Sequence, residues 1–339
     1  MKEISITDIK GYRIGHARDA EGGTGCTVII CDKGMTAGIS VEGGGPAGRE
    51  TELLNPKMHC QEISAVGLSG GSAYGLDSAS GVMRYLEEKN IGYDVGMGVV
   101  PLVPASCLFD LVAGDFNCRP DSDMGYAACV DSEDYEGKSD KQLKGNVGAG
   151  TGCTVGKFLG LERTMKSGIG TYAVQQGDLK VGAIVAVNAL GDIFDADTGK
   201  QIAGMLSEDG EGLASTREVM WNSILQQKNV FTGNTTIGAV ICNARLTKAQ
   251  CHKLASMTQD GYARVIRPVH TTADGDTIYF LADGNTYEGQ ESVEVNQDAL
   301  GDLASYVIAK AINDAVRSAE SAYGFSAEYG FKAACELKE

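Results

Sequence analysis

Short apolar runs recur along this chain, and glycine-rich or polar segments separate them. Runs of this kind, rich in valine and isoleucine, are typical of buried β-strands. The predicted strands are Cys26–Cys31, Ile63–Leu68, Val95–Val100, Ile169–Val174, Val181–Val187, Thr236–Cys242 and Thr277–Leu281.

Helical periodicity occupies three segments between and after these strands. Apolar residues spaced by three or four predict one helix over 72–89, and the clearest amphipathic pattern covers 300–316. Thr247 and Gln250 form a capping box that predicts the start of a third helix. Because strands and helices interleave, the sequence predicts an α/β or α+β fold in which helices cover sheets.

Two polar segments are predicted to be linkers or loops. The segment 131–143 crowds Asp, Glu, Lys, Ser and Gly together, and the segment 223–233 ends just before the predicted strand 236–242. A peptide bond that is to be cleaved must be accessible and strained, so it is expected at the end of such a loop.

Composition narrows the function classes. The chain has 339 residues, 43% of them hydrophobic, which suits one large α/β unit. Its net charge of −16 repels phosphate backbones and argues against nucleic acid as a partner. We find no run that approaches a membrane span and no apolar core of a signal peptide near residue 1, so a cytoplasmic protein is expected. The ten cysteines are scattered and form no zinc pattern, so no metal is expected.

The step from Asn234 to Thr235 is the most informative local feature. It lies where a polar loop enters a predicted strand, so the Thr235 hydroxyl would stand beside its own upstream peptide bond. An N-terminal-nucleophile hydrolase needs this arrangement, because the hydroxyl attacks that carbonyl and the freed amine then serves as general base. In isolation, Asn-Thr-Thr also forms an ordinary turn before a strand.

Three further features could serve this nucleophile. Asp274 and Asp276 are two residues apart, so both carboxylates can point to one side and tune the proton affinity of nearby groups. Lys157 ends a glycine-rich turn and Asn188 follows a predicted strand, and either could stabilise an oxyanion. Each feature also has a structural interpretation, as a polar turn, a surface lysine or a strand cap.

One competing nucleophile is Ser69. The segment Gly67–Gly71 matches G-x-S-x-G and lies between a predicted strand and a predicted helix, which is the context of a nucleophile elbow. In that fold the histidine follows the acid along the chain, but His252 and His270 both precede Asp274. Asp110 or Asp115 would then have to be the acid.

Several long motifs, in a fixed order over most of the chain, resemble the DmpA-type L-aminopeptidase/D-esterase family. That family includes bacterial β-aminopeptidases and the nylon-oligomer (6-aminohexanoate-oligomer) hydrolases. The segments that carry the resemblance are Ile14–His16, Thr24–Val28, Gly43–Thr51, Leu68–Leu76, Gly148–Lys157 and Asn234–Thr236.

The resemblance implies a self-processing hydrolase with a four-layer α/β/β/α sandwich fold. Cleavage between Asn234 and Thr235 would leave an α chain of residues 1–234 and a β chain of residues 235–339, and related proteins assemble as tetramers of αβ pairs. Thr235 would be the N-terminal nucleophile, and Asn188 would be the oxyanion donor beside Lys157.

The resemblance also assigns the supporting residues and the substrate class. Asp274 and Asp276 match a pair of positions that supports the nucleophile, and Asp-x-Asp is more similar to the nylon-oligomer branch than to the peptidase branch. Tyr126 is the candidate for the active-site tyrosine of the family, and Ser69 would lose its role as nucleophile. The expected substrates are small amides or short peptides, with no cofactor.

Two other functions stay open at this point. An acyltransferase of the ornithine-acetyltransferase type would share the self-cleavage but pass the acyl group to an amine. A non-catalytic binding protein would keep the fold as one intact polypeptide.

Overall fold

The computed structural model describes residues 1–225, 233–283, 293–323 and 330–337. Ten strands form the main sheet, in the order β1-β11-β12-β15-β17-β3-β5-β8-β4, with β2 paired to β3. Their bounds are β1 (Lys2–Ile4), β2 (Arg13–Asp19), β3 (Thr24–Val41), β4 (Ala47–Arg49), β5 (Glu62–Ser69), β8 (Ala105–Cys107), β11 (Ile169–Gln176), β12 (Leu179–Asn188), β15 (Thr235–Cys242) and β17 (Thr277–Ala282).

Strand β3 joins two layers of this sheet. Its first half pairs with β2 and β5, and its second half, residues 36–41, pairs with β17. The register between β3 and β5 shifts between Ile30 and Met35, and such an irregularity bends a strand. Side chains of β5 such as Val66 pack in one core cluster with Ile184 of β12 and Ile237 of β15, so the two halves stack face to face.

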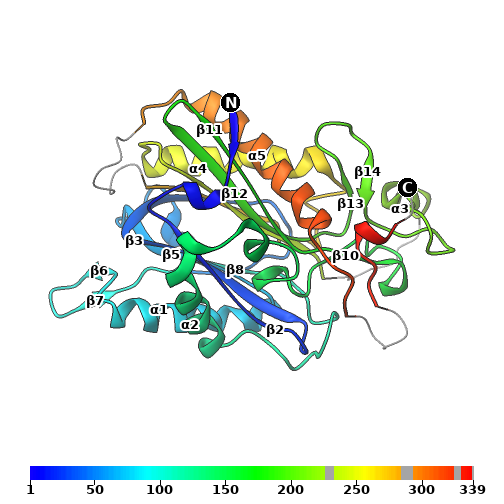
Figure 1. The fold of residues 1–339 in the computed structure, drawn as a ribbon, viewed down its shortest axis with the longest axis horizontal. Helices are drawn as coiled ribbons and strands as arrows, with labels where there is room; N and C mark the ends of the chain where they lie inside the picture. Colours follow the sequence, from blue (N-terminus) through cyan, green and yellow to red (C-terminus); the bar gives the residue numbers. More distant parts are fainter. Residues whose placement is uncertain (226–232, 284–292, 324–329, 338–339) are drawn as a thin grey trace.

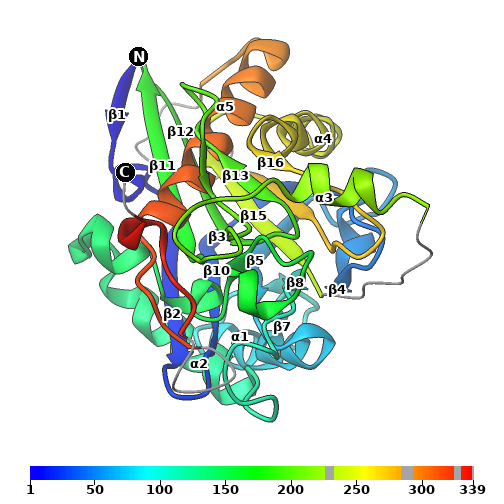
Figure 2. The ribbon, with the colours of Figure 1, turned by 90° about the vertical axis from the view of Figure 1, so that its right-hand side faces the viewer.

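Helices cover the outer face of each half. Helices α4 (Lys248–Val265) and α5 (Gln297–Arg317) pack in one core with Val185, Val240 and Phe280 of the sheet. The neighbours of these three residues in sequence point to the opposite face, into the core between the two sheet layers. Helices α1 (Ser78–Glu88) and α2 (Ser122–Asp131) cover β2, β3 and β5 on the opposite side. Figures 1 and 2 show the two helix pairs outside the sheets. The fold is therefore the four-layer α/β/β/α sandwich that the resemblance implied.

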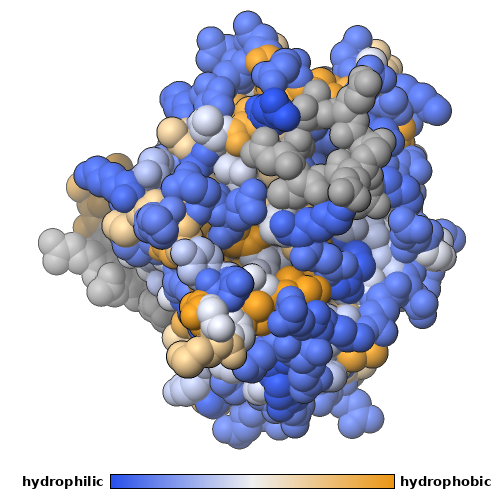
Figure 3. Space-filling view, turned by 90° about the vertical axis from the view of Figure 1, so that its left-hand side faces the viewer, coloured by the Kyte–Doolittle hydropathy of each residue, from blue (hydrophilic) through white to orange (hydrophobic). Residues whose placement is uncertain are grey.

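The remaining elements are short. They are β6 (Tyr93–Asp94), β7 (Val99–Val100), β9 (Thr154–Val155), β10 (Met165–Lys166), β13 (Asp192–Phe194), β14 (Gln201–Ala203), β16 (Ile266–Arg267) and α3 (Thr216–Asn222), with 3-10 turns between them. Among the described helices, none combines the length and the apolar character that crossing a bilayer requires. One side of the molecule is mainly hydrophilic with small hydrophobic areas (Figure 3), in keeping with its charge.

Most predicted elements form, but two predictions about local structure were wrong. The run 95–100 is not a buried strand, because glycines interrupt it; it makes the exposed turn of the β6–β7 hairpin, where Met97 is 97% exposed. The segment 131–143 is not a linker, since it forms two 3-10 helices that bury Tyr135 and Leu143. In the predicted loop 223–233, residues 226–232 lie outside the described part of the chain.

Close packing of α4 on β3 leads to a first prediction. A Cβ added at Gly38 would lie 2.2 Å from the backbone of Cys251 and His252, so Gly38→Ala must push the helix away from the sheet. We expect a loss of about 1–3 kcal/mol in the free energy of unfolding, the usual cost of overpacking, measured by urea denaturation. Gly98→Ala, where nothing lies within 4 Å of the added Cβ, is the control. Equal stability of the two variants would contradict the close approach.

Candidate active site

Three neighbouring strands in the middle of the main sheet, β12, β15 and β17, bring the predicted site residues together at one end of the strands. Asn188, the last residue of β12, pairs directly with Thr235, the first residue of the antiparallel strand β15. Asn234 forms a parallel bridge to Asp274, just before β17. All four residues are buried, with Thr235 4% exposed. The register of the sheet thus places residues far apart in sequence around one peptide bond.

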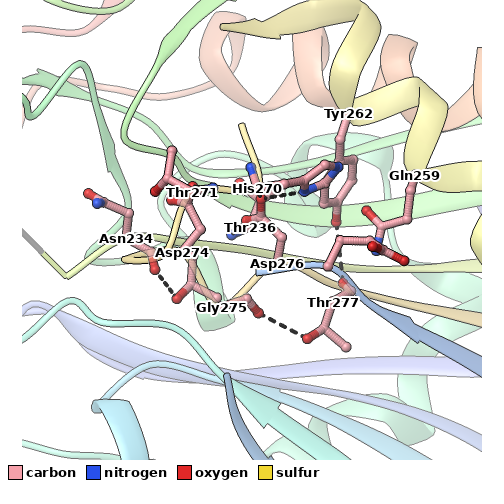
Figure 4. Close-up of polar contacts among 12 residues, drawn as sticks. Asn234, Thr236, Gln259, Tyr262, His270, Thr271, Asp274, Gly275, Asp276 and Thr277 are labelled. Carbon is pink, nitrogen blue, oxygen red and sulfur yellow. Dashed lines mark hydrogen bonds and ion pairs between the residues drawn. The ribbon is translucent and has the colours of Figure 1, made fainter. Parts of the chain in front are cut away.

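The carbonyl oxygen of Asn234 is the centre of this arrangement. In the uncut chain, meaning the polypeptide with the Asn234–Thr235 bond intact, the Thr235 hydroxyl donates a short hydrogen bond to that oxygen. The backbone N–H of Gly275 donates to the same oxygen over 3.2 Å. Figure 4 shows Asn234 beside the segment that contains Asp274, Gly275 and Asp276. A hydroxyl and a backbone N–H, the groups that a nucleophile and an oxyanion donor require, therefore meet at one carbonyl.

Asn188 faces a different set of partners. Its side-chain N–H donates to the carbonyl of Phe109 over 2.8 Å, and its side-chain oxygen accepts from Lys157 Nζ (2.6 Å) and from the N–H of Thr154 (3.0 Å). In the uncut chain the donor to the Asn234 carbonyl is thus the Gly275 N–H and not the amide of Asn188. The role of Asn188 as oxyanion donor for a substrate, which the resemblance implies, stays a prediction.

Lys157 links Asn188 to the segment before the cleavage site. Its ammonium donates to the backbone carbonyls of Asn188 (3.0 Å) and Gly233 (3.3 Å). The side chain is buried, and burial lowers the pKa of Lys157 to about 7. The lysine is therefore no surface residue but a buried donor that can be neutral or charged near neutral pH.

Asp274 and Asp276 lie on both sides of Gly275 and have different partners. Asp274 accepts from the N–H of Thr271 (2.6 Å), and burial together with the charge of Asp276 raises the pKa of Asp274 to about 6. Asp276 accepts from the N–H of Thr236 (2.8 Å), and it also contacts the backbone N–H and the ring Nδ1 of His270. Asp276 thus fixes the backbone just after the nucleophile.

Gly275 is a site residue that sequence reasoning missed, and His270 was considered only as a partner of Ser69. Burial alone would lower the pKa of His270, but its hydrogen bond to Asp276 and the charge of that carboxylate outweigh burial and raise it above the ordinary value (Figure 4). At Gly275, an added Cβ would lie 2.8 Å from the Thr235 hydroxyl oxygen, so only glycine fits without pressing on the nucleophile. The glycine between Asp274 and Asp276 is the sequence signal for this close contact, but Asp-Gly is also common in ordinary turns.

Two other sequence predictions lie elsewhere. Tyr126 is on α2 in the outer helical layer, where its hydroxyl donates to Glu88 (2.7 Å) and its ring contacts Tyr85 and Arg84. The structure therefore does not bring Tyr126 to Thr235. Ser69 is fully buried at the end of β5, so the exposed hydroxyl of a nucleophile elbow is not formed.

Comparison with known proteins gives the family and the fold of this chain. A model of Peptidase family S58 matches residues 5–329. The chain belongs to Peptidase family S58. Relatives of this S58 chain include an uncharacterized aminopeptidase of Mycobacterium leprae, 38% identical over 94% of this chain and 92% of the relative. A 6-aminohexanoate-oligomer endohydrolase of Kocuria sp. is 28% identical over 93% of this chain and 87% of that protein.

Solved structures show the fold of this S58 protein independently. The L-aminopeptidase D-Ala-esterase/amidase from Ochrobactrum anthropi, described as a variant of the Ntn-hydrolase fold, aligns with a TM-score of 0.68 at 16% identity. A Burkholderia sp. β-aminopeptidase aligns with a TM-score of 0.66 at 20% identity. Both alignments cover 97% of this chain and 90% of the other. The four-layer fold is thus that of the Ntn-hydrolase variant.

The buried lysine gives a prediction about pH. Because the pKa of Lys157 is about 7 in the folded state and has its ordinary value near 10.5 in the unfolded state, the unfolded state binds more protons between these pH values. The contribution of Lys157 to stability is therefore lowest below about pH 7 and rises up to about pH 10.5. We expect the free energy of unfolding of the protein with Lys157, minus that of the Lys157→Met variant, to increase from pH 7 to pH 10.

This comparison is made by urea denaturation in the uncut Thr235→Ala background, so that both proteins are single chains. Other buried groups then contribute equally and cancel in the difference. Lys141→Met, at an exposed position, is the control and should show no such slope. If the stability difference between the parent protein and Lys157→Met stays constant with pH, the lysine does not change charge in this range.

Proposed function

We propose that this protein is a self-processing N-terminal-nucleophile hydrolase that cuts its own chain before Thr235 and then hydrolyses small amides or short peptides. The observation that carries the proposal is the contact of the Thr235 hydroxyl with the carbonyl of Asn234, with the Gly275 N–H on the same oxygen. Membership of Peptidase family S58 and relatives named as aminopeptidases support the amide-bond chemistry.

Self-cleavage proceeds as an acyl shift followed by hydrolysis. The Thr235 hydroxyl oxygen bonds to the carbonyl carbon of Asn234, the carbon–nitrogen bond breaks, and the nitrogen gains the proton that the hydroxyl loses. The Gly275 N–H stabilises the oxyanion that forms in between. Water then hydrolyses the new ester, which leaves a carboxylate on Asn234 and a free amine and hydroxyl on Thr235.

Turnover reuses the same groups. The amine of Thr235 takes the proton from its own hydroxyl, and its ordinary pKa of about 7.7–8.0 suits a base near neutral pH. The hydroxyl oxygen attacks the substrate carbonyl, the amine of the leaving group departs with a proton, and water releases the acyl group from Thr235. Asp274 forms a backbone bridge with Asn234, on the other side of the bond to be cut, while Asp276 accepts from the N–H of Thr236. Lys157 and Asn188 keep the opposite strand in place.

The nucleophile is tested by substitution at Thr235. The wild-type protein should separate on a denaturing gel into chains of residues 1–234 and 235–339, the smaller beginning Thr-Thr-Ile-Gly. Thr235→Ala removes the attacking oxygen, so we expect one uncut band and no hydrolysis of aminoacyl-p-nitroanilides, measured by absorbance.

Thr236→Val is the matched control for this experiment. Its buried hydroxyl has no hydrogen-bond partner in the part of the chain that the structure describes, and valine has the same shape. We expect this variant to cut itself. Cleavage at the same bond in Thr235→Ala would contradict the assignment of the nucleophile.

The glycine beside the nucleophile gives a second test. Gly275→Ala places a methyl group 2.8 Å from the Thr235 hydroxyl oxygen, and a displaced nucleophile costs about 10²-fold in rate. We expect self-cleavage to slow by about this factor, measured from the band intensities over time. At Gly45, next to Asp274, an added Cβ meets its neighbours only at 3.7 Å, so Gly45→Ala should cut at the wild-type rate. Equal rates of self-cleavage for both variants would show that Gly275 does not limit the position of the Thr235 hydroxyl.

A further inference from the structure

The uncut chain traces the path of an acyl group through the site. Its segment Gly233–Asn234 ends at the carbonyl that Thr235 attacks, so this segment occupies the acyl side of the reaction. If the proposed function holds, a substrate attacked by the same hydroxyl and held by the same Gly275 N–H must follow the same path. Its acyl residue then takes the place of Asn234, and any residue further upstream takes the place of Gly233.

The ring of Phe109 lies against this path at Gly233 and leaves no room for a side chain there. A Cβ added to Gly233 would lie 2.2, 2.4 and 2.7 Å from three ring carbons of Phe109. Gly233 is buried and has a φ of +56°, a conformation that side chains other than glycine seldom adopt. The space upstream of the acyl residue therefore accepts a backbone without a side chain and nothing larger.

The wall that Phe109 forms is tied to the rest of the site. The carbonyl of Phe109 accepts from the side chain of Asn188 (2.8 Å), which also holds Lys157. The next residue, Asp110, is fully buried and accepts from the N–H of Gly71 (2.6 Å) and the hydroxyl of Thr24 (2.7 Å). The backbone under the ring is thus fixed from both sides, while the half-buried ring faces the path.

The other end of the acyl residue has a polar partner. The N–H of Asn234 donates to the carbonyl of Ala273 over 3.4 Å, at the backbone bridge between Asn234 and Asp274. A substrate that ends at its acyl residue would place its ammonium group at this position, where the carbonyl accepts a hydrogen bond from the positive charge. A substrate that continues upstream would instead have to pass Phe109.

We propose that Phe109 is a specificity-determining residue that disfavours a side chain at the second residue before the scissile bond, so that the mature enzyme removes single amino-terminal residues in preference to dipeptides. This inference rests on the proposed function and selects between terminal removal and internal cutting, the two modes that the relatives' names represent. Peptides with a side chain at the second residue before the scissile bond are rejected by the ring. Glycine at that position is tolerated better.

The test compares three p-nitroanilides on processed protein: alanyl, glycyl-alanyl and alanyl-alanyl. Mass spectrometry of the products separates release of an intact dipeptide from stepwise removal of single residues. For the wild type, we expect kcat/KM for release of alanyl-alanine to be at least about tenfold below that for glycyl-alanine, the scale of an overpacked contact. Phe109→Ala should bring the two dipeptide rates together.

A series of Phe109 variants with side chains of decreasing size separates the effect of the ring from an effect on folding. Phe109→Tyr keeps the ring and should keep the wild-type ratio of the dipeptide rates. Phe109→Leu should give a ratio between those of Phe109→Tyr and Phe109→Ala. A processed Phe109→Ala enzyme with the wild-type ratio would overturn the proposal, as would a wild type that releases alanyl-alanine as fast as glycyl-alanine. Failure of the proposed function has another signature, a wild-type chain that stays uncut or hydrolyses none of the three compounds.

Self-cleavage gives a second readout of the same contact. Gly233→Ala should slow cutting of the wild-type chain, because the new methyl group meets the ring. In the Phe109→Ala background that collision is absent, so Gly233→Ala should slow cutting at least about tenfold less. An equal effect of Gly233→Ala in both backgrounds would show that backbone strain alone, and not the ring, limits this position.

Discussion

The hydrogen bond from the Thr235 hydroxyl to the carbonyl of Asn234 is the contact on which the rest of the site depends. It forms because Thr235 is the first residue of a strand paired on both sides, with β12 and β17, so its backbone cannot rotate away. The turn before β17 then sets the N–H of Gly275 on the same oxygen. The end of a rigid central strand thus aims the Thr235 hydroxyl at its own peptide bond before any substrate is present.

Keeping Lys157, Asp274 and Asp276 inside the protein is costly unless each has partners. Asp276 has three nitrogen partners, and Lys157 donates to three oxygens. Burial leaves the pKa values of Lys157 near 7 and of Asp274 near 6, so both groups can exchange protons close to neutral pH. Groups with pKa values moved toward neutrality gather where proton transfer is needed. The buried charges are therefore better explained by chemistry than by stability.

Sequence patterns predicted the central strands and the place of Thr235 at the start of one of them, because both depend on local information. A strand such as β15 is an apolar run, and Thr235 is found where a polar loop enters it. The bend of β3 could not be predicted, since it depends on which strands pair with each half. The partners of Asn188 and the role of Phe109 depend on the register between distant segments. Local sequence patterns do not encode that register, and the same limit applies to Tyr126, the candidate for the active-site tyrosine, which lies on α2 in the outer helical layer.

Cutting the chain also changes which charges face each other. The contacts that hold the upstream end are long, at 3.3 Å from Lys157 to Gly233 and 3.4 Å from Asn234 to Ala273, and such hydrogen bonds are weak. In the proposed cleavage Asn234 gains a new carboxylate in a site that already holds the buried side chains of Asp274 and Asp276, and buried like charges repel. The new amine of Thr235, when protonated, is instead attracted to these carboxylates. The buried carboxylates would thus favour departure of the segment that fills the acyl side and retention of the base.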